Sequence, residues 1–265
     1  MKYDPVKDKI MHLIQKMPFM RKMFFYALDM LFLRQWYVKK HVLSLFRNKS
    51  AIDFFDAGAG FCQYSDFVLN TWQDSKVHAA DLKTDYMTQY ASYAEHVYPE
   101  RFSWKQADLV QYKPEIRFDL ILAIDILEHI EDDRQVLSNF FDCLKSGGIL
   151  IISTPSDKDE AARFTEEHVR PGYDKSDLSD KLTNAGFSIK NFQFSYGIFG
   201  KLSWKLSIYY PLKLVSISKY MLLLLPIYYI ALYLPIYILM QLDINTYNKS
   251  GNGIIVVAEK PINAF

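Results

Sequence analysis

Short apolar runs alternate with stretches of helical periodicity along most of this chain. A short apolar run bounded by turn-forming residues is typical of a buried strand, whereas apolar positions three and four apart indicate a helix. Seven strands are predicted. Six of them lie at 51–55, 77–81, 118–125, 149–153, 187–196 and 253–258, and the third strand in chain order ends at 106–109. Helices are predicted at 61–73, 84–97, 133–145 and 174–185. The alternation predicts an α/β fold with a doubly wound, seven-stranded Rossmann-like sheet.

The amino-terminal segment shows helical periodicity only, and no strand is predicted in it. Residues 6–47 carry apolar side chains at helical spacing, and Pro18 interrupts the pattern. The second part, 20–46, is apolar, aromatic and basic, with Asp29 as its one acid. Such a segment either caps the sheet and closes a pocket or lies on an anionic membrane surface, and the two roles are compatible. We predict an amino-terminal helical cap at 1–49.

An apolar insertion separates the sixth and seventh predicted strands. Between Lys219 and Asp243 no residue is charged, and this run is long enough for a transmembrane helix. Two strands that neighbour each other in one sheet require the insertion to leave and return on the same side of a bilayer, and Pro226 and Pro235 are expected to break the run into pieces of about two turns. The pattern therefore predicts a monotopic hairpin of short apolar helices that contacts a membrane through 202–242. A buried helical subdomain and a homodimer interface are the alternatives.

Composition narrows the class of protein. The 265 residues are 50% hydrophobic, and a net charge of +1 argues against a nucleic-acid partner. Two cysteines, Cys62 and Cys143, make no disulfide framework, and no Cys/His spacing indicates a metal site. The amino terminus is too charged for a signal peptide. We expect a cytoplasmic protein, peripheral or monotopic at the inner face of the membrane.

The first predicted strand ends in an acid and two glycines, Asp56, Gly58 and Gly60. Glycine allows positive φ and a close approach of the backbone to a ligand, and the first turn of the next helix offers free N–H groups. The second strand ends at Asp81 and the third at Asp108. These acids indicate a nucleotide site. Structural alternatives are a ligand-free turn at the glycines, a helix cap at Asp81 and a turn residue at Asp108.

At these residues the sequence resembles the class I S-adenosylmethionine-dependent methyltransferases. The resemblance covers about 50–150, including the run 118–125 and the Leu-Glu-His that follows it, and 251–260 is similar to the family's last strand. It implies S-adenosylmethionine as cofactor. The residues implied to bind the cofactor are Asp56, Gly58 and Gly60 at the methionine part, Asp81 at the ribose, Asp108 at the adenine, and the neighbouring Leu109 and Asp125. Cys62 stands where the family has a third glycine, and we expect it to crowd the site slightly.

Candidate groups for proton transfer cluster in two places. Asp125 and His129 follow the fourth strand, at the sheet edge where open α/β folds bind ligands. His168 and Tyr173 follow the fifth strand at the same edge, in a stretch similar to a loop of many bacterial small-molecule methyltransferases. A histidine there can titrate near neutrality and accept a hydroxyl proton. We predict His168 as the first candidate base and His129 as the second. Alternatively, the loop is only held by local bonds and His129 only caps a helix.

These features together predict a methyltransferase that acts on a lipophilic or membrane-borne small molecule, with oxygen as the acceptor atom. Phenols, quinone precursors, polyenes and lipid-linked groups are suitable acceptors. A dinucleotide-dependent oxidoreductase is the alternative enzyme, since an acid after the second strand also suits NAD, and a membrane-bound scaffold without activity is the alternative outside enzymes. The predicted domains are the cap at 1–49, a cofactor-binding domain at 50–197 plus 251–265, and the insertion at 198–250.

Overall fold

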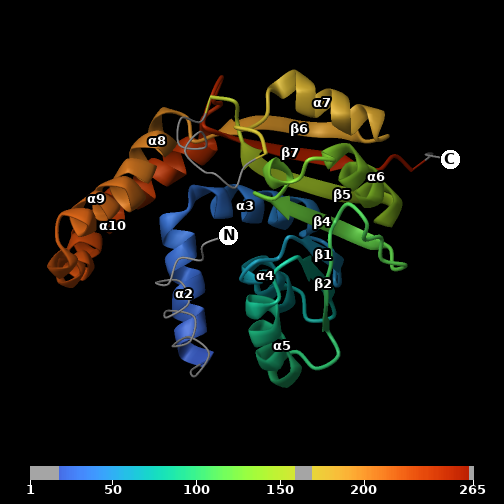
Figure 1. Ribbon diagram of the computed structural model, residues 1–265, viewed down its shortest axis with the longest axis horizontal. Helices are drawn as coiled ribbons and strands as arrows, with labels where there is room; N and C mark the ends of the chain where they lie inside the picture. Colours follow the sequence, from blue (N-terminus) through green and yellow to red (C-terminus); the bar gives the residue numbers. More distant parts are fainter. Residues whose placement is uncertain (1–17, 159–168, 263–265) are drawn as a thin grey trace.

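A seven-stranded mixed sheet forms the centre of the computed structural model, which describes residues 18–158 and 169–262 (Figure 1). The strands lie in the order β3-β2-β1-β4-β5-β7-β6, and β7 runs antiparallel between β5 and β6. The order confirms that the sixth and seventh strands are neighbours. The strands are β1 Asp53–Ala57, β2 Lys76–Asp81, β3 Phe102–Gln106, β4 Phe118–Ile124, β5 Leu144–Pro155, β6 Ser188–Ser195 and β7 Gly253–Glu259.

Two hydrophobic cores cover the two faces of the sheet. Successive side chains of a strand point to opposite faces, so Phe54 and Phe55 of β1 belong to different cores. Helices α4 and α5 pack on one face and α6 and α7 on the other, as the predicted doubly wound fold requires. The four helices are α4 Gln63–Thr71, α5 Asp85–Val97, α6 Asp133–Cys143 and α7 Lys175–Asn184.

The described part of the amino-terminal segment is helical, as the predicted cap requires, and consists of two helices. Helix α2 spans Pro18–Leu31 and α3 spans Leu33–Phe46, with Phe32 between them in extended conformation at φ −114° and ψ 105°. Leu33 and Tyr37 of α3 are buried in the core beside the sheet, whereas α2 points away from the sheet (Figure 1). Neither proline nor glycine marks the break. It results from the tertiary packing that pulls α3 into the core.

The insertion is a helical hairpin, as predicted, but its second arm is not broken by the prolines. Helix α10, Leu225–Asn245, continues through Pro235, and Pro226 occupies its first turn, where a missing N–H costs little. The chain reverses instead at Ser218, which is extended and whose side chain accepts a bond from the amide of Tyr220. The other parts are α8 Ile198–Trp204, the π-helical η3 Lys205–Tyr209, α9 Tyr210–Ile217 and the 3-10 helical η4 Lys219–Leu224.

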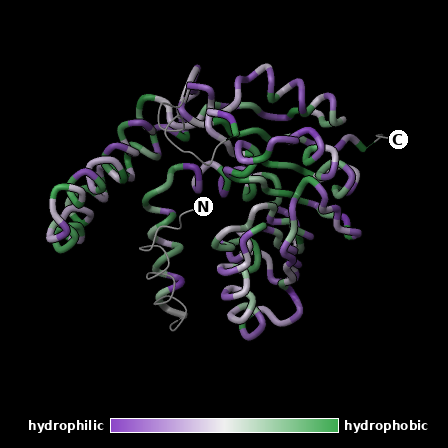
Figure 2. The backbone as a smooth tube through the Cα atoms, in the orientation of Figure 1, coloured by the Kyte–Doolittle hydropathy of each residue, from purple (hydrophilic) through white to green (hydrophobic). Residues whose placement is uncertain are grey.

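Hydrogen bonds fix the base of this hairpin, its foot, to the rest of the fold. The foot consists of α8, the start of η3 and the end of α10 near Asp243. Asp243 of α10 is fully buried; its carboxylate accepts bonds from the amide of Gly200 and the hydroxyl of Tyr37, at 2.8 and 2.9 Å. Ile236 and Met240 of α10 join the core beside α3. Beyond this foot the hairpin extends away from the sheet, and hydrophobic residues run along it and along α2 as well as through the central strands (Figure 2).

Candidate functional site

The glycine loop after β1 lies at the carboxyl edge of the sheet. Gly58 and Gly60 have φ of +76° and +50°, which glycine adopts without strain. The amide of Gly58 donates to the carbonyl of Ala80 at 2.8 Å, and a Cβ on Gly58 would lie 2.8 Å from Cγ1 of Ile126. At Gly60 no atom lies within 4 Å of such a Cβ. The loop is therefore packed tightly at its first glycine and open toward a ligand at its second.

Asp56 lies beneath this loop and only 2% of its surface is exposed. Its carboxylate accepts bonds from the amide and the hydroxyl of Ser65 in α4, at 3.1 and 2.6 Å. Burial raises the pKa of Asp56 to about 7, although the bonds from Ser65 oppose the shift. The structure thus gives Asp56 a role in joining the loop to α4, and leaves no carboxylate surface for the direct cofactor contact that the sequence predicted.

Asp81 ends β2 beside the open part of the loop. One carboxylate oxygen accepts from the amide of Gly60 at 3.0 Å and the other from the amide of Lys83 at 2.9 Å. The cap residue of α5 is Thr84, so Asp81 is not the cap of that helix. Its carboxylate is half-exposed at the same edge as the glycines, and its contact with the ribose stays a prediction.

Asp108 lies next to Asp81, because the amide of Ala107 donates to the carbonyl of Asp81 at 3.0 Å. The carboxylate of Asp108 accepts from the amide of Val110, as in an ordinary Asx turn, and remains exposed. Leu109 is buried below it. The structure therefore brings Asp56, the two glycines and these two acids to one edge of the sheet.

Cys62, at the third glycine position, does not crowd the loop. Its φ of +60° lies in the left-handed region that glycine favours, and its side chain is fully buried in the core with Val68 and Leu69 of α4. The backbone geometry of the motif is thus preserved with a cysteine. The expectation of a slightly crowded site is wrong, because this Cβ points inward.

Asp125 borders a cavity of about 570 Å³, which is large enough for a small-molecule ligand. Its φ is +50°, its amide donates to the carbonyl of Ser153, and its carboxylate forms an ion pair with Arg34 of α3. Tyr196, another left-handed residue at φ +54°, lines the same cavity. Strained backbone of this kind is retained mostly at functional sites. The cavity lies between the carboxyl ends of β4 and β5, the start of α3 and the foot of the hairpin.

The candidate groups for proton transfer differ in how far they are buried. His129 is half-buried in a short 3-10 helix, η1 Leu127–His129, directly after Asp125, and the neighbouring Glu128 is buried with a pKa raised by that burial. Tyr173 is buried, and its hydroxyl donates to Asp133 at 2.6 Å and accepts from Arg170 at 2.7 Å.

Burial and the bond to Asp133 raise the pKa of Tyr173, so its hydroxyl serves loop packing and not proton transfer to a ligand. The predicted catalytic role of Tyr173 is therefore corrected. His168 lies outside the described residues. Arg34 and Tyr196 were missed by sequence reasoning, since they belong to no motif and reach the site only through long-range packing.

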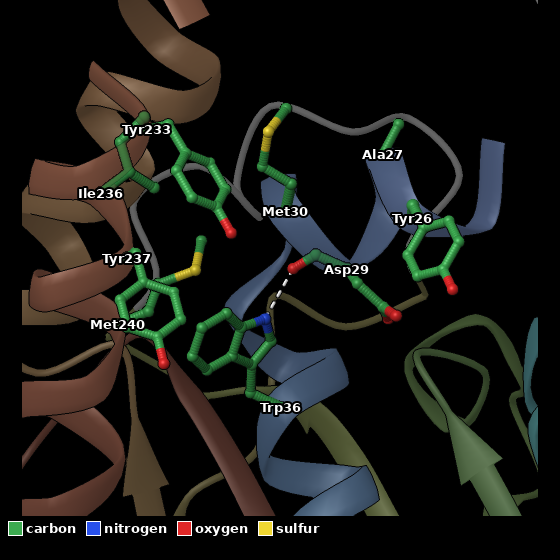
Figure 3. A pocket seen from close by; sticks show the side chains of 9 residues that line it. All are labelled: Tyr26, Ala27, Asp29, Met30, Trp36, Tyr233, Ile236, Tyr237 and Met240. Atoms are coloured by element: carbon green, nitrogen blue, oxygen red, sulfur yellow. Dashed lines mark hydrogen bonds between the residues drawn. The ribbon is translucent and has the colours of Figure 1, made fainter. Parts of the chain in front are cut away.

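A further cavity, of about 390 Å³, lies between α2, α3 and α10 (Figure 3). Aromatic side chains and two methionines surround it, and Trp36 at its floor donates its ring N–H to the carbonyl of Asp29 at 2.6 Å. The carboxylate of Asp29 is already paired with Lys39 at 2.6 Å. The cavity suits apolar groups and offers no free acid or base for chemistry.

Within residues 18–158 and 169–262, no three His, Cys, Asp or Glu side chains are grouped as they would be to hold a metal ion. The groups that converge on the edge of the sheet are open backbone amides, carboxylates and one ion pair. They suit an organic cofactor with a ribose, and the cavity that Asp125 borders is a separate space.

Comparison with known proteins agrees with this geometry. Residues 55–150 match the family model described as a methyltransferase domain. The chain is 23% identical over 189 residues to a ubiquinone biosynthesis O-methyltransferase of Rickettsia canadensis, which covers 66% of this chain and 79% of that protein. It is 35% identical over 83 residues to phosphoethanolamine N-methyltransferase 1 of Arabidopsis thaliana, and this match spans only 29% of the chain and 17% of the plant enzyme.

Solved structures share the fold. Phosphoethanolamine N-methyltransferase 2 of Haemonchus contortus, solved with S-adenosyl-L-methionine, superposes with a TM-score of 0.58 at 18% identity. The superposition covers 84% of this chain and 52% of the other. At this level of identity the likeness establishes the architecture and leaves the acceptor open.

Proposed function

The chain belongs to the class I S-adenosylmethionine-dependent methyltransferases, and on this premise we propose that it methylates an oxygen of a lipophilic acceptor at a membrane surface. The observation that carries the proposal is the position of the apolar hairpin. Its foot, through Lys201 and Trp204, forms one wall of the cavity that Asp125 borders. An element suited to lipid and the acceptor cavity are thus parts of one structure.

The hairpin exposes far more apolar surface than a soluble monomer usually tolerates. The segment Lys219–Asn245 is long and apolar enough to cross a membrane by length and composition alone, and only 6% of its most apolar window is buried. Both arms start at the sheet, so a monotopic insertion from one side fits the fold better than a crossing. Each apolar side chain moved from water into lipid contributes roughly 1.5 to 3 kcal/mol. The proposed location is the inner face of the membrane.

A second membrane contact is proposed through α2. Met23 and Tyr26 are exposed on this helix, while Arg21 is buried against the rings of Tyr90 and Tyr93 in α5. Helix α3 packs one face in the core and leaves Leu43 and Leu45 exposed near its end. Of the segment 20–46, α2 exposes the more apolar side chains.

The reaction is an in-line displacement. The acceptor oxygen forms a bond to the methyl carbon while the carbon–sulfur bond of S-adenosylmethionine breaks, and its electron pair stays on the sulfur of S-adenosylhomocysteine. A neutral hydroxyl must lose its proton as this happens, and a carboxylate or imidazole in reach accepts it. Asp125 borders the cavity, and His129 follows it on η1. We assign the proton to one of these or to His168, and the ribose diol to Asp81.

Oxygen as acceptor atom is supported by the relative from Rickettsia canadensis, whose name describes an O-methyltransferase of ubiquinone biosynthesis. The test combines binding and turnover. Calorimetry is expected to show binding of S-adenosylmethionine and none of NAD, which separates the proposal from an oxidoreductase. Incubation with methyl-labelled cofactor and a membrane lipid extract is expected to yield label that partitions into acidified butanol and resists acid treatment as an ether does. Cofactor binding without any labelled product would contradict the assigned activity.

A further inference from the structure

The acceptor cavity carries an excess of positive charge. Its described lining contains four cationic side chains, Arg34, Lys158, Lys201 and Lys205, against one carboxylate, Asp125. Arg34 is paired with that carboxylate. Among the residues that the structure describes, no acid lies within ion-pair distance of the other three. Three ammonium groups thus line one cavity, and within 18–158 and 169–262 no carboxylate forms an ion pair with them.

The lysines approach the cavity from two sides. Lys158 follows β5, whereas Lys201 and Lys205 lie one turn apart at the foot of the hairpin, in α8 and η3. Residues four apart lie on one face of a helix, so the two hairpin lysines present their charges together. The aromatic rings of Trp204 and Tyr209 line the same wall. Charge and aromatic surface therefore alternate along one side of the cavity.

Resting on the proposed function, we infer that the methyl acceptor carries an anionic oxyacid group, a phosphate or carboxylate, beside an aromatic or aliphatic body. Ammonium groups bind such anions through charge-assisted hydrogen bonds. The aromatic wall holds the body of the acceptor, and the anionic group sets its orientation. This fixes which hydroxyl faces Asp125, and it selects against neutral and cationic acceptors of the same size.

The test uses the full-length protein saturated with S-adenosylhomocysteine. Ligand-observed NMR titration measures the affinity for phenyl phosphate, with phenol as the neutral probe of similar shape. The double variant Lys201→Gln/Lys205→Gln is expected to weaken phenyl phosphate binding by about tenfold or more and to leave phenol unchanged. The control is Lys213→Gln/Lys219→Gln, since these lysines lie on the same hairpin outside the cavity lining. It is expected to leave both affinities unchanged.

The anionic group of the acceptor could belong to a lipid headgroup or to a soluble molecule. Flotation with phosphatidylcholine vesicles, with and without phosphatidate, distinguishes these two sources. Loss of phenyl phosphate binding in the cavity variant supports the inference, with phosphatidate binding lost for a lipid acceptor and retained for a soluble one. Equal binding of phenol and phenyl phosphate overturns it, as does an equal effect of the control variant. A variant that loses phosphatidate binding alone also overturns it, because the lysines then serve only the membrane. Absence of S-adenosylhomocysteine binding would instead refute the proposed methyltransferase function.

Discussion

At the scale of single residues, the cofactor side of the site depends on two acids with different tasks. Asp56 is buried and joins the glycine loop to α4 through Ser65, whereas Asp81 keeps a half-exposed carboxylate at the loop's open end. We propose that the first affects the stability of the fold and the second the affinity for the cofactor. Substitutions at the two positions should therefore separate in unfolding and binding experiments.

Asp56 makes stability depend on pH. In the unfolded chain it loses its proton near the ordinary pKa of 3.8, and in the folded protein near about 7. Between these values the folded state holds a proton that the unfolded state has released. This contribution to stability is therefore full below about pH 4 and is lost as the pH rises through 7.

Asp56→Asn cannot titrate and removes this dependence. In urea unfolding without ligand, the stability of the variant relative to the parent is expected to rise between pH 5 and pH 8 by about 3 kcal/mol, because about two pH units of this range lie below the folded pKa. Asp74→Asn, at an exposed turn, is expected to follow the parent throughout. A constant difference between Asp56→Asn and the parent over this range would mean that the carboxyl is already ionised in the folded protein at pH 5.

Asp81→Ala is expected to weaken S-adenosylmethionine binding by roughly 2 to 3 kcal/mol, because two charge-assisted bonds to the ribose are lost. Asp81→Asn should cost less, since its amide oxygen still accepts from the amide of Gly60. Calorimetry gives the affinities, and circular dichroism checks the fold. Unchanged affinity in a folded Asp81→Ala protein would assign the carboxylate to the loop alone.

At the scale of elements, the buried carboxylate of Asp243 joins the two arms of the hairpin, α10 and α8, and fastens them to α3. Asp243→Ala leaves the buried amide of Gly200 without its acceptor, while the hydroxyl of Tyr37 keeps only the backbone carbonyl of residue 243, which costs about 2 kcal/mol locally. Hydrogen exchange in α8 and α10 should accelerate, while that of β4 and β5 should not. Thr246→Val, at an exposed position on the same turn of chain, is the control. Equal acceleration throughout the sheet would show that the hairpin and the sheet unfold as one unit.

At the scale of the whole molecule, we propose that the exposed apolar surface of the hairpin brings the protein to a membrane. Leu223 and Ile230 are 77% and 79% exposed there, and Val97 and Ile116, far from the hairpin in sequence, are 47% and 55% exposed. The double variant Leu223→Lys/Ile230→Lys is expected to reduce partition into lipid vesicles by about a hundredfold or more, since each lost side chain contributes at least roughly 1.5 kcal/mol. Val97→Lys/Ile116→Lys should float like the parent.

The alternative occupant of the hairpin surface is a second copy of the chain. Sedimentation of the detergent-free protein distinguishes the two. A parent protein that fails to float and sediments as a dimer, with Leu223→Lys/Ile230→Lys as a monomer, would assign the surface to a homodimer interface and contradict the membrane proposal.

The sequence by itself determined the sheet and the cofactor edge. Strands such as β4 and the loop of Gly58 and Gly60 follow from local periodicity and from the few residues that tolerate positive φ, so their positions were predicted within a few residues. The family resemblance rests on the same local motifs. The order of the strands follows general rules for how successive elements connect. On this basis β7 was correctly placed beside β6.

Only the tertiary structure decided how distant segments meet. The break at Phe32, the continuity of α10 through Pro235 and the inward turn of Cys62 depend on what each residue packs against, and local propensity is too weak to settle such choices. At the cavity of about 570 Å³, the fold brings Arg34 to Asp125 and the hairpin lysines to the end of β5. Such contacts join residues far apart in the chain, and their energies arise from packing and charge across the fold, which no local pattern records.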